Sequence, residues 1–545
     1  MMERRARSRQ GTALLHLRRE LGRAVGGPEA RRNVGRGGLI ALDGTAGGRG
    51  QSAVGEFPNR DRTRNMTNST QLAVIGGGPG GYAAAFLAAD LGMQVTLIDE
   101  AAHPGGVCLY RGCMPSKALL HVAKVLTEAR EARAWGVEFG EPALDLDRLR
   151  TWKEGVVDRL TGGLGQLSTQ RGVTYLRGRA ELLSPTSLRV TRSDDTDGDN
   201  EPVELTFAHG ILSTGSRPAV PAALSLDSER VWDSTRALDL PSVPGSLLVV
   251  GGGYIGLELG SVYAALGSAV TVVEMTSGLL PGADRDLVSV VARRLDSLCE
   301  AVRLETTVVG LADDGDGVRV TLEGAAVDHP EHHFDRVLVA VGRVPNSDIP
   351  GLERTAVQRD ARGFVVVDGQ RRTGEPSLFA VGDLVGEPML AHKASHEARI
   401  AVEAIAGHKA GFEPGAIPAV VFTDPEVAWC GLTETQAKAD GRSVQVTRFP
   451  WAASGRALTL DRPSGVTKLI IDPESEQILG VGIAGTGAGE LIAEGVVAIE
   501  MGATAADLRL CIHPHPTLSE TLMESAEVFF GQSTHVYRPK RAPKA

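Results

Sequence analysis

The sequence predicts an α/β protein in which one nucleotide-binding unit occurs twice and a separate α+β region follows. Two observations support this prediction. A strand, a glycine-rich turn, a helix and a strand that ends in an acidic residue occur in this order over residues 72–99 and again over residues 247–274. In both copies, the terminal acid stands 23 positions after the first glycine of the turn. A whole unit repeated at one spacing indicates two Rossmann-like dinucleotide-binding domains.

The first glycine-rich turn follows a buried-type strand from Leu72 to Ile75. We expect Gly76 to make the tight turn, Gly78 to let the backbone approach a pyrophosphate, and Gly81 to let the next helix pack on the strand. Asp99, at the end of the second strand, can accept a hydrogen bond from a ribose hydroxyl. Strand, helix and carboxylate in this order favour dinucleotide binding over an incidental glycine turn.

The second turn contains Gly251, Gly253 and Gly256 and leads to Glu274 at the end of its second strand. Glu274 is expected to bond the 2′- and 3′-hydroxyls of an adenosine ribose and to repel a 2′-phosphate. No arginine follows it immediately to bind such a phosphate. The second unit is therefore predicted to bind NAD rather than NADP, which leaves the first unit for FAD or another nucleotide.

Two cysteines, Cys108 and Cys113, stand close together ahead of a helix-like run. A disulfide between them would close a very short loop, and short or strained disulfides tend to be readily reduced and catalytic. Because residues five positions apart lie on different faces of an ideal helix, the pair needs an irregular helix start, which Gly112 permits and Pro115 suits. Two unpaired core thiols, or half of a metal site, are the alternatives.

The composition argues against several classes of function. A formal charge of −10 and a pI near 5.8 argue against nucleic-acid or anionic-membrane binding. No apolar run approaches the roughly 20 residues that a membrane span needs. The remaining cysteines, Cys299, Cys430 and Cys511, are scattered in apolar contexts and are expected to be reduced structural thiols. We therefore expect a soluble, cytoplasmic protein.

The N-terminal 65 residues differ from the rest of the chain. They contain 14 Arg and no Lys against 6 acidic residues, and they are rich in glycine. Disorder is the expected state. An Arg-rich start is typical of an organelle transit peptide, which would place the protein in an organelle matrix, but six acidic residues are too many for one. Met66 stands immediately before the first strand, so residues 1–65 are interpreted as an upstream extension.

The chain between the two units is predicted to contain helices over Ala118 to Trp135 and Leu144 to Leu167. Strands are expected over Val173 to Leu176 and over Ala180 to Val190. The segment from Ser193 to Glu201 is dense in Asp and Gly, and we expect a surface loop rather than a metal site because its carboxylates lack the spacing of a calcium loop.

Later glycine turns mark further boundaries. The cluster from Thr214 to Pro218 indicates a crossing between domains. A strand from Val337 to Val341 leads into Gly342, and another strand leads to Asp383. At such a turn Asp383 is a plausible acceptor for polyol hydroxyls, and the alternative is an N-cap for the following segment. From Ile417 onward, β-like and helix-like runs alternate, which predicts the separate α+β unit.

Near the C-terminus, His513 and His515 lie in a proline-rich loop before Glu520. A histidine backed by a carboxylate can be held in one tautomer and used as a general base near neutral pH. The prolines on both sides of His515 restrict the backbone and present the side chain rigidly. Capping of a helix and metal binding are the alternatives.

The cysteine pair between two nucleotide fingerprints, together with the terminal His-Pro-Thr-x-x-Glu, resembles the pyridine nucleotide-disulfide oxidoreductases, and most closely those that oxidise dihydrolipoamide. The resemblance runs from about Gln71 to about Gln532. It implies the following domains: an FAD-binding domain with the redox disulfide (66–216), an NAD-binding domain (217–343), a central part that completes the FAD domain (344–412), and a C-terminal dimerisation domain (413–545).

The resemblance also implies roles for single residues. The interchange thiol falls on Cys108, the flavin-proximal thiol on Cys113, and the catalytic acid-base on His515 oriented by Glu520. The family lysine near flavin N5 and its ion-pair partner beside the nicotinamide path match Lys117 and Glu258. The remaining matches are FAD contacts (Asp99, Ala180, Thr214, Asp383 and Ala391) and NAD contacts (Glu274, Val308 and Gly342). Three positions depart from the family pattern, namely Tyr110, Met114 and Pro514.

The activity implied by the resemblance is oxidation of dihydrolipoamide to lipoamide with reduction of NAD+ through the Cys108–Cys113 disulfide. It further implies a homodimer, in which His515 serves the opposite subunit, and docking to the lipoyl domains and core of a 2-oxo acid dehydrogenase complex. No metal is expected. Mercuric reductase is disfavoured because residues 537–545 lack a cysteine pair, and glutathione reductase because Ser116 stands where a lysine is usual. A redox-silent flavoprotein scaffold is disfavoured because the reacting residues are intact.

Overall fold

The computed structural model describes residues 68–193, 201–325 and 327–537. The predicted extension over residues 1–65 lies outside the described residues, and so do residues 194–200 of the predicted loop. Within the described part, two sheets with parallel strands precede an antiparallel sheet flanked by helices. The predicted fold class, α/β with a C-terminal α+β region, is confirmed.

The first sheet has six strands, and β1 lies in its interior. It pairs in parallel with β2 and β5, while β4 joins β3 to β5 in an antiparallel arrangement. Both faces of β1 are covered, because Leu72 and Val74 pack with helices α2 and α9 and the alternate residues pack on the other side. This double burial explains its continuous apolar run. The bounds are β1 (Asn68–Ile75), α2 (Pro79–Asp90), β2 (Val95–Asp99), β3 (Thr174–Ser184), β4 (Ser187–Arg192), β5 (Val203–Leu212), β16 (Leu378–Ala380) and α9 (Ala391–Ile405).

The predicted strand boundaries in this sheet were wrong in two ways: the break expected between Leu176 and Ala180 lies inside β3, and a turn interrupts the second expected strand. A strand was expected from Ala180 to Val190, but β3 runs from Thr174 to Ser184 and β4 begins at Ser187. Ala180 and Val190 are instead cross-strand partners in an antiparallel hairpin. Pro185 lies in the turn, where its missing N–H removes no ladder hydrogen bond. The apolar alternation continues on both sides of this turn and therefore hid it.

The second sheet is entirely parallel, in the order β10-β9-β8-β14-β7. Its helix α7 begins directly after the second glycine-rich turn. A three-stranded antiparallel sheet follows. The bounds are β7 (Val231–Trp232), α6 (Ser234–Asp239), β8 (Ser246–Val250), α7 (Tyr254–Leu266), β9 (Ala269–Val273), α8 (Arg285–Leu298), β10 (Ala301–Arg303), β11 (Thr306–Asp313), β12 (Val318–Gly324), β13 (Glu331–Phe334) and β14 (Arg336–Val339).

The chain leaves the first sheet and returns to it through two adjacent strands. The outgoing strand β6 (Ser216–Pro218) pairs antiparallel with the returning strand β15 (Arg343–Pro345). After β15, the chain supplies β16, which pairs in parallel with β5. Residues that are far apart in the sequence therefore meet at the edge of the first nucleotide-binding unit.

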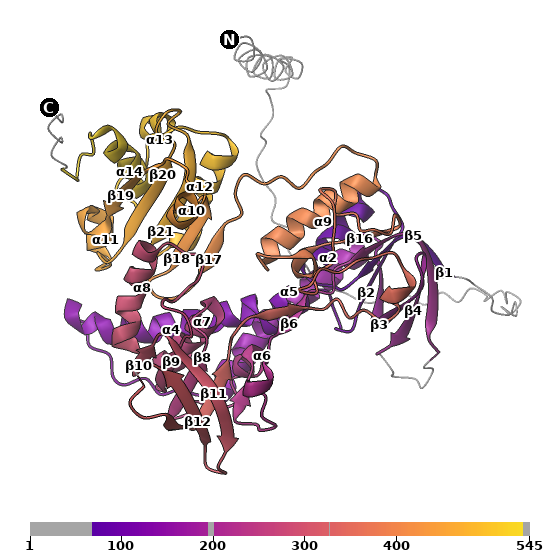
Figure 1. Ribbon diagram of the computed structural model, residues 1–545, viewed down its shortest axis with the longest axis horizontal. Coiled ribbons are helices and arrows are strands. Elements are labelled where there is room, and N and C mark those ends of the chain that lie inside the picture. The colour runs from indigo at the N-terminus through magenta and orange to yellow at the C-terminus, as the bar shows by residue number, and fades with distance from the viewer. Residues whose placement is uncertain (1–67, 194–200, 326, 538–545) are drawn as a thin grey trace, which may run out of the picture. The chain divides into compact units, whose positions relative to one another are not determined.

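The C-terminal sheet is antiparallel, in the order β17-β18-β21-β20-β19, and Figure 1 shows it with α12 and α14. These two helices pack through Ile492 and Leu522 on one face. On the other face, a side chain at Gly482 would meet Leu287 of α8 at 2.7 Å. The bounds are β17 (Ala419–Val421), β18 (Val427–Gly431), α10 (Glu434–Ala439), β19 (Gln445–Pro450), α11 (Gly455–Thr459), β20 (Val466–Ile471), β21 (Ile478–Ala484), α12 (Ala488–Glu500), α13 (Ala505–Leu510) and α14 (Glu520–Phe530).

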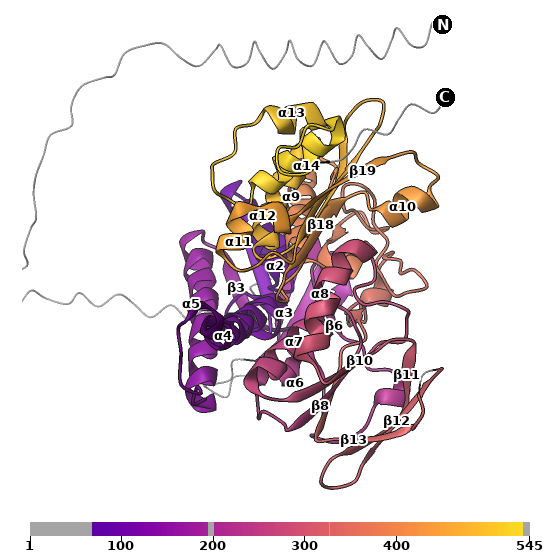
Figure 2. The same cartoon turned by 90° about the vertical axis from the view of Figure 1, so that its left-hand side faces the viewer.

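The cysteine segment forms two helices, α3 (Gly106–Arg111) and α4 (Cys113–Glu131). The long helix α5 (Leu146–Gln170) lies against α4, as Figure 2 shows, and α4 also packs on α7 of the second unit. Helix α4 therefore connects the two nucleotide-binding units. No helix among the described residues is long and apolar enough to cross a membrane.

Candidate active site

The first glycine-rich turn is closely packed at two glycines and open at the third. Gly76 has φ +103°, and a Cβ there would lie 2.4 Å from the Ser213 carbonyl oxygen. A Cβ at Gly81 would lie 1.7 Å from the Gly76 oxygen, so the helix approaches the strand as predicted. Around Gly78 the nearest atom, Cα of Gly106, would be 3.9 Å away. This space lets a pyrophosphate reach the backbone.

Asp99 lies beside this turn at the end of β2. Its carboxylate accepts hydrogen bonds from Gly77 N–H (2.5 Å) and Ala101 N–H (2.9 Å). A carboxylate offers about four lone-pair directions, so both contacts leave capacity for a ribose hydroxyl. The main-chain bonds fix the orientation in which Asp99 would accept it.

The second turn repeats this construction. Gly251 has φ +111°, and a Cβ at Gly256 would lie 2.2 Å from the Gly251 oxygen. A Cβ at Gly253 would meet nothing within 4 Å. Glu274 is buried and accepts from Gly252 N–H (2.7 Å) and from the Thr276 N–H (2.8 Å) and hydroxyl (2.7 Å). Both turns therefore combine packed glycines, one open glycine and an acid held by the backbone.

The cysteine segment docks directly on the first turn. Gly105 N–H donates to the Gly77 oxygen at 2.8 Å. Gly106 has φ +57°, and a Cβ there would lie 2.4 Å from Cα of Gly78. Only glycine tolerates this conformation and this approach together. The contact places the helix that carries Cys108 beside the predicted pyrophosphate position.

The two cysteines belong to different helices, as the irregular helix start predicted. Cys108 lies in α3 and Cys113 is the first residue of α4, with Gly112 (φ −148°, ψ −112°) between the helices. The two sulfur atoms lie within hydrogen-bonding reach of each other. The backbone kink at Gly112 thus brings together two side chains that one continuous helix would separate.

The surroundings make the two thiols unequal. The hydrogen bond from Cys108 and the nearby Lys117 ammonium lower the pKa of Cys113 to about 7, while burial and Glu258 act in the opposite direction. The hydrogen bond to Cys113, burial and the charge of Cys113 raise the pKa of Cys108. The position of Cys113 at a helix N-terminus also favours the anion. Near neutral pH the reduced pair therefore carries its negative charge on Cys113.

An ion pair links the cysteine helix to the second unit. Lys117 Nζ lies 2.8 Å from Glu258 Oε2, and Ser116 Oγ donates to the same oxygen at 3.0 Å. The other oxygen accepts the Phe422 N–H at 3.0 Å. Glu258 is 3 % exposed, so its carboxylate lies away from bulk water, whereas the Lys117 side chain is 31 % exposed. The two residues that the sequence assigned as partners are thus in contact.

Asp383 lies shortly after β16, the strand that completes the first sheet, and it is not an N-cap. The 3₁₀ helix Gly382–Val385 has Val381 as its N-cap and no side-chain cap. Asp383 instead accepts a hydrogen bond from the Ser216 hydroxyl at 2.5 Å, and Ser216 accepts from Arg343 Nε at 2.7 Å. The acid is held at the crossing strands rather than capping a helix, so the alternative interpretation was wrong.

The other predicted contact residues occupy varied positions. Thr214 and Asn346 exchange hydrogen bonds of 2.8 and 2.9 Å across the crossing strands. Ala391 is the first residue of α9, where the main-chain N–H has no partner within the helix. Ala180 in β3 and Val308 in β11 are buried, so only their backbones could reach a ligand. Gly342 has φ +126° and open space around it.

His515 and Glu520 form the predicted pair, in the loop before α14. Nδ1 of His515 lies 2.9 Å from Glu520, whose other oxygen accepts the Thr517 N–H at 2.8 Å. Burial acts to raise the pKa of Glu520, but these hydrogen bonds outweigh it and hold the pKa below its usual range. The His515 side chain is 76 % exposed. Among the described residues, no hydrogen bond joins it to Cys108 or Cys113 of the same chain.

The neighbouring His513 is held within its own subunit. Its Nε2 lies 2.7 Å from Glu494 and its Nδ1 lies 3.1 Å from the Cys511 carbonyl oxygen. The side chain is 7 % exposed. It is therefore a structural histidine, whereas His515 is free to meet a ligand or another subunit.

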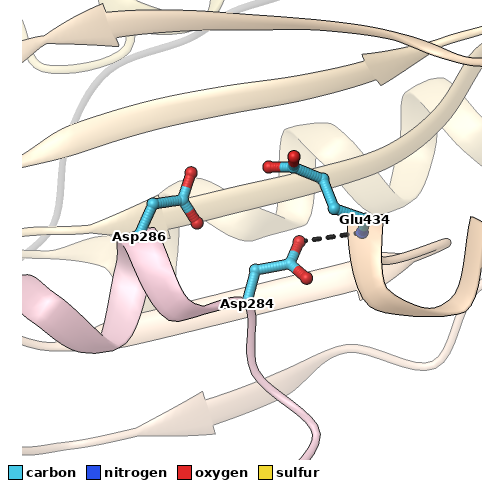
Figure 3. A group of neighbouring side chains, drawn as sticks. All are labelled: Asp284, Asp286 and Glu434. Carbon is cyan, nitrogen blue, oxygen red and sulfur yellow. Dashed lines mark hydrogen bonds between the residues drawn. The ribbon is translucent and has the colours of Figure 1, made fainter. Parts of the chain in front are cut away.

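Three carboxylates that could hold a metal ion lie elsewhere, and a lysine already occupies the position between them. Asp284, Asp286 and Glu434 face one another in Figure 3. Lys468 Nζ lies 2.6, 2.8 and 2.8 Å from their oxygens, and its side chain is 1 % exposed. Although burial acts in the opposite direction, the Lys468 ammonium holds the pKa of Asp284 below its ordinary value. The cluster is an internal ion-pair network between α8 and the C-terminal sheet.

Two residues of the site were not identified from the sequence. Ser116 was noted only as a difference from other enzymes, although its hydroxyl bonds Glu258. Phe422 was not singled out in the region after Ile417, yet it contacts both Lys117 and Glu258. It lies 164 positions from Glu258, so no local sequence pattern could have revealed the contact.

Comparison with known proteins places the whole described arrangement in one family. Residues 70–398 match the family described as pyridine nucleotide-disulphide oxidoreductase, and residues 417–526 match the dimerisation domain of the same family. The chain is 46% identical over 474 residues to a protein of Vibrio cholerae named dihydrolipoyl dehydrogenase, covering 87% of this chain and 98% of that protein. A protein of the same name from Haloferax volcanii is 43% identical over 472 residues and covers 86% of this chain and 98% of its own.

Solved structures agree with this placement. LpdA from Mycobacterium tuberculosis superposes with a TM-score of 0.77 at 27% identity, covering 84% of this chain and 99% of that one. The HOCl-induced flavoprotein disulfide reductase RclA from Escherichia coli, solved as a Cu(II) complex, has a TM-score of 0.75 at 29% identity and covers 85% of this chain and 99% of its own.

Proposed function

Because this chain belongs to the pyridine nucleotide-disulphide oxidoreductase family, we propose that it oxidises dihydrolipoamide to lipoamide and reduces NAD+. The observation that carries the proposal is the cysteine pair docked on the first glycine turn, with the anion on Cys113. A thiol pair poised in this way suits exchange with a dithiol substrate.

The cofactors are FAD and NAD, and both glycine turns fit a dinucleotide. Each turn has one glycine with open space, and each has an acid oriented by main-chain N–H groups. When bound, FAD takes up the electron pair of the dithiol and supplies it as hydride to NAD+. The residues proposed to hold FAD are Gly76, Gly78, Gly81, Asp99, Lys117, Ala180, Thr214, Asp383 and Ala391, and those for NAD are Gly251, Gly253, Gly256, Glu258, Glu274, Val308 and Gly342.

We infer the exchange steps from the chemistry of the protein groups. His515 takes a proton from one substrate thiol, and the resulting thiolate attacks Cys108 Sγ of the oxidised pair. The Cys108–Cys113 bond breaks and Cys113 leaves as a thiolate next to Lys117. The second substrate thiol then attacks the substrate sulfur of the mixed disulfide, and its proton passes to the departing Cys108 Sγ. Lipoamide leaves as the cyclic disulfide, with Cys108 a thiol, Cys113 a thiolate and His515 protonated. Glu520 keeps His515 in the tautomer that presents Nε2 to the substrate.

A homodimer completes this site. His515 has no bond to the cysteine pair of its own chain, so we infer that it serves the pair of a second copy. The C-terminal region also exposes apolar side chains in and near its helices, and Ile512, three residues before His515, is 99 % exposed. Val497, Met501 and Leu510 are exposed as well. Exposed apolar side chains suit an interface with a second subunit.

The physiological substrate is proposed to be a lipoyl domain of a 2-oxo acid dehydrogenase complex, whose core would hold the dimer. The cytoplasm is the proposed location, because Cys299, Cys430 and Cys511 are unpaired thiols and fit a reducing compartment.

Steady-state kinetics test the proposal. We expect NAD+ reduction with dihydrolipoamide and little NADPH oxidation with glutathione disulfide or Hg(II). In His515→Gln, dihydrolipoamide oxidation should fall by about a thousandfold while FAD content stays normal, because the general base is lost but no cofactor contact is. His513→Gln is the matched control and should keep most of the activity. Near-normal turnover in His515→Gln would contradict the assignment.

A further inference from the structure

Phe422, the residue after β17, contacts both members of the Lys117–Glu258 ion pair. Its main-chain N–H donates to Glu258 Oε1 at 3.0 Å. The Lys117 ammonium lies over its ring, 4.5 Å from the centroid. A residue of the C-terminal region therefore reaches the helix that carries Cys113.

The N–H contact completes the bonding of a buried carboxylate. Glu258 Oε2 receives Ser116 and Lys117, both from α4, whereas Oε1 receives Phe422. A buried carboxylate oxygen without a donor is costly, so the carboxylate is fixed between the two sources of donors. The position of residue 422 thereby sets the direction in which Glu258 holds Lys117.

The ring contact acts on the cation. The Lys117 side chain is 31 % exposed, and Lys117 and Phe422 both line a cavity of about 280 Å³. Lysine has a long flexible side chain, so its ammonium could turn toward this cavity. Attraction to the ring face favours the observed position. Lys117 is four residues after Cys113 on the same face of α4, so this position also determines how strongly the positive charge acts on the thiol.

We propose that Phe422 is a positioning residue for the redox pair: its N–H orients Glu258, and its ring keeps the Lys117 ammonium on the side of Cys113. The inference deepens the proposed function, because it concerns the acidity of a thiol that takes part in the proposed exchange. It does not depend on the identity of the dithiol substrate.

The charged and titratable groups that face Cys113 come from four helices. They are Cys108 of α3, Lys117 of α4, Glu258 and Tyr254 of α7, and Tyr82 of α2. The contacts of Phe422 are with Lys117 and Glu258. A change in the Phe422 ring should therefore reach Cys113 through Lys117, which makes the route testable.

The test measures the pH dependence of Cys113 alkylation in anaerobically reduced holoenzyme. Iodoacetamide labelling is followed on the Cys113 peptide by mass spectrometry, so that Cys511 and the other thiols do not interfere. In Phe422→Leu we expect the Cys113 pKa to rise by about half a unit, which slows labelling at pH 7 about twofold. Phe422→Tyr keeps the ring face and should restore the wild-type profile.

Two comparisons separate this effect from a general loss of structure. Phe364→Leu makes the same change in a ring that carries Arg362 at 5.1 Å and touches neither Lys117 nor Glu258, and it should leave the profile unchanged. In a Lys117→Met background, Phe422→Leu should add no further shift, because the charge it acts through is gone.

Three results would overturn the proposal: an unshifted profile in Phe422→Leu, an equal shift in Phe364→Leu, or a full shift in the Lys117→Met background. FAD content and circular dichroism of each variant establish that it is folded. The labelling assay contains no dihydrolipoamide, so a chain that fails to oxidise that substrate would still give a decisive result for Phe422.

Discussion

The two glycine-rich turns are built alike, but they differ in what covers them. In both, a strand leads to a glycine with positive φ, a helix packs on the strand through a second glycine, and an acid accepts main-chain hydrogen bonds. Over the first turn, the cysteine segment lies so close that Gly106 meets Gly78. At the second turn, the space around Gly253 is open.

This difference matches the two modes in which a cofactor is used. A nucleotide on the first turn would be bound beneath the cysteine helix and would remain with the protein between turnovers. A nucleotide on the second turn can enter and leave from the open side, as a co-substrate must. The same local architecture thus serves a resident cofactor or an exchangeable one, according to what the rest of the chain places over it.

The largest effect is expected where the cysteine segment contacts the first glycine-rich turn. Gly106→Ala should destabilise the protein by about 3 kcal/mol or more and release much of its FAD, because a Cβ would meet Cα of Gly78 at 2.4 Å in a strained conformation. Thermal unfolding and the flavin absorbance of the purified protein measure both effects.

Gly172→Ala is the control that separates the backbone strain of a positive φ from the steric clash of a Cβ at Gly106. Gly172 also has positive φ, +68°, but open space around it, so only about 1 kcal/mol should be lost and FAD should be kept. If Gly106→Ala loses no more stability and no more FAD than Gly172→Ala, the cysteine segment is not tightly packed on the first turn. The proposed difference between the two turns would then be wrong.

In the second turn, Gly253→Ala should leave stability unchanged and weaken NAD+ binding by about 30-fold or more. Gly253 has φ −78° and a Cβ would meet no protein atom within 4 Å, so the methyl group intrudes only on the ligand. The KM for NAD+ and the melting temperature report the two quantities. Gly260→Ala, whose Cβ would make ordinary contacts, is the control. A normal KM in Gly253→Ala would mean that the nucleotide does not approach this glycine.

A smaller effect is expected from Glu274→Gln. The amide keeps one acceptor oxygen but presents an NH₂ group to donors that Glu274 now satisfies, namely Gly252 and Thr276. We expect the KM for NAD+ to rise about fivefold with kcat little changed, since binding is weakened equally before and during reaction. The corresponding Asp99→Asn should leave that KM unchanged and affect FAD content instead. A raised KM for NAD+ in Asp99→Asn would reverse the assignment of the two turns.

The last prediction concerns the pH response of Cys113, the thiol beside the first turn. The pKa of Cys113, lowered to about 7, predicts that the thiolate is present above this pH and is lost as the pH falls through it. Alkylation of Cys113 in reduced enzyme should therefore slow about tenfold for each unit below pH 7. Peptide-resolved labelling between pH 5 and pH 9 measures this profile. A midpoint at the ordinary value of 9.0 would show that the surroundings do not favour the anion.

Local spacing predicted those parts of the molecule that depend on neighbours in the sequence. The packed roles of Gly76 and Gly81 follow from one strand–turn–helix unit and are found as expected. The irregular helix start at Gly112 also follows from the five-residue interval. The boundary between β3 and β4 was misplaced because the apolar alternation continues through the turn at Pro185.

Contacts between distant segments could not be predicted in this way. Phe422 meets Glu258 only because the C-terminal region folds back on α7, and nothing in the sequence around residue 422 marks this. Similarly, His513 and His515 look alike in a proline-rich loop. Only their environments, one beside Glu494 and one exposed, distinguish the structural histidine from the candidate base.

The lysine at the centre of the acidic cluster bears on how the protein could be divided or recombined. Lys468 belongs to β20 of the C-terminal sheet, while Asp284 and Asp286 belong to the segment at the start of α8. Exchanging the C-terminal sheet for that of a relative without a cation at this position would leave two acids facing each other at a sealed junction, a cost of several kcal/mol. In a chimera of this enzyme, Lys468 and its acidic partners should therefore all come from the same parent protein.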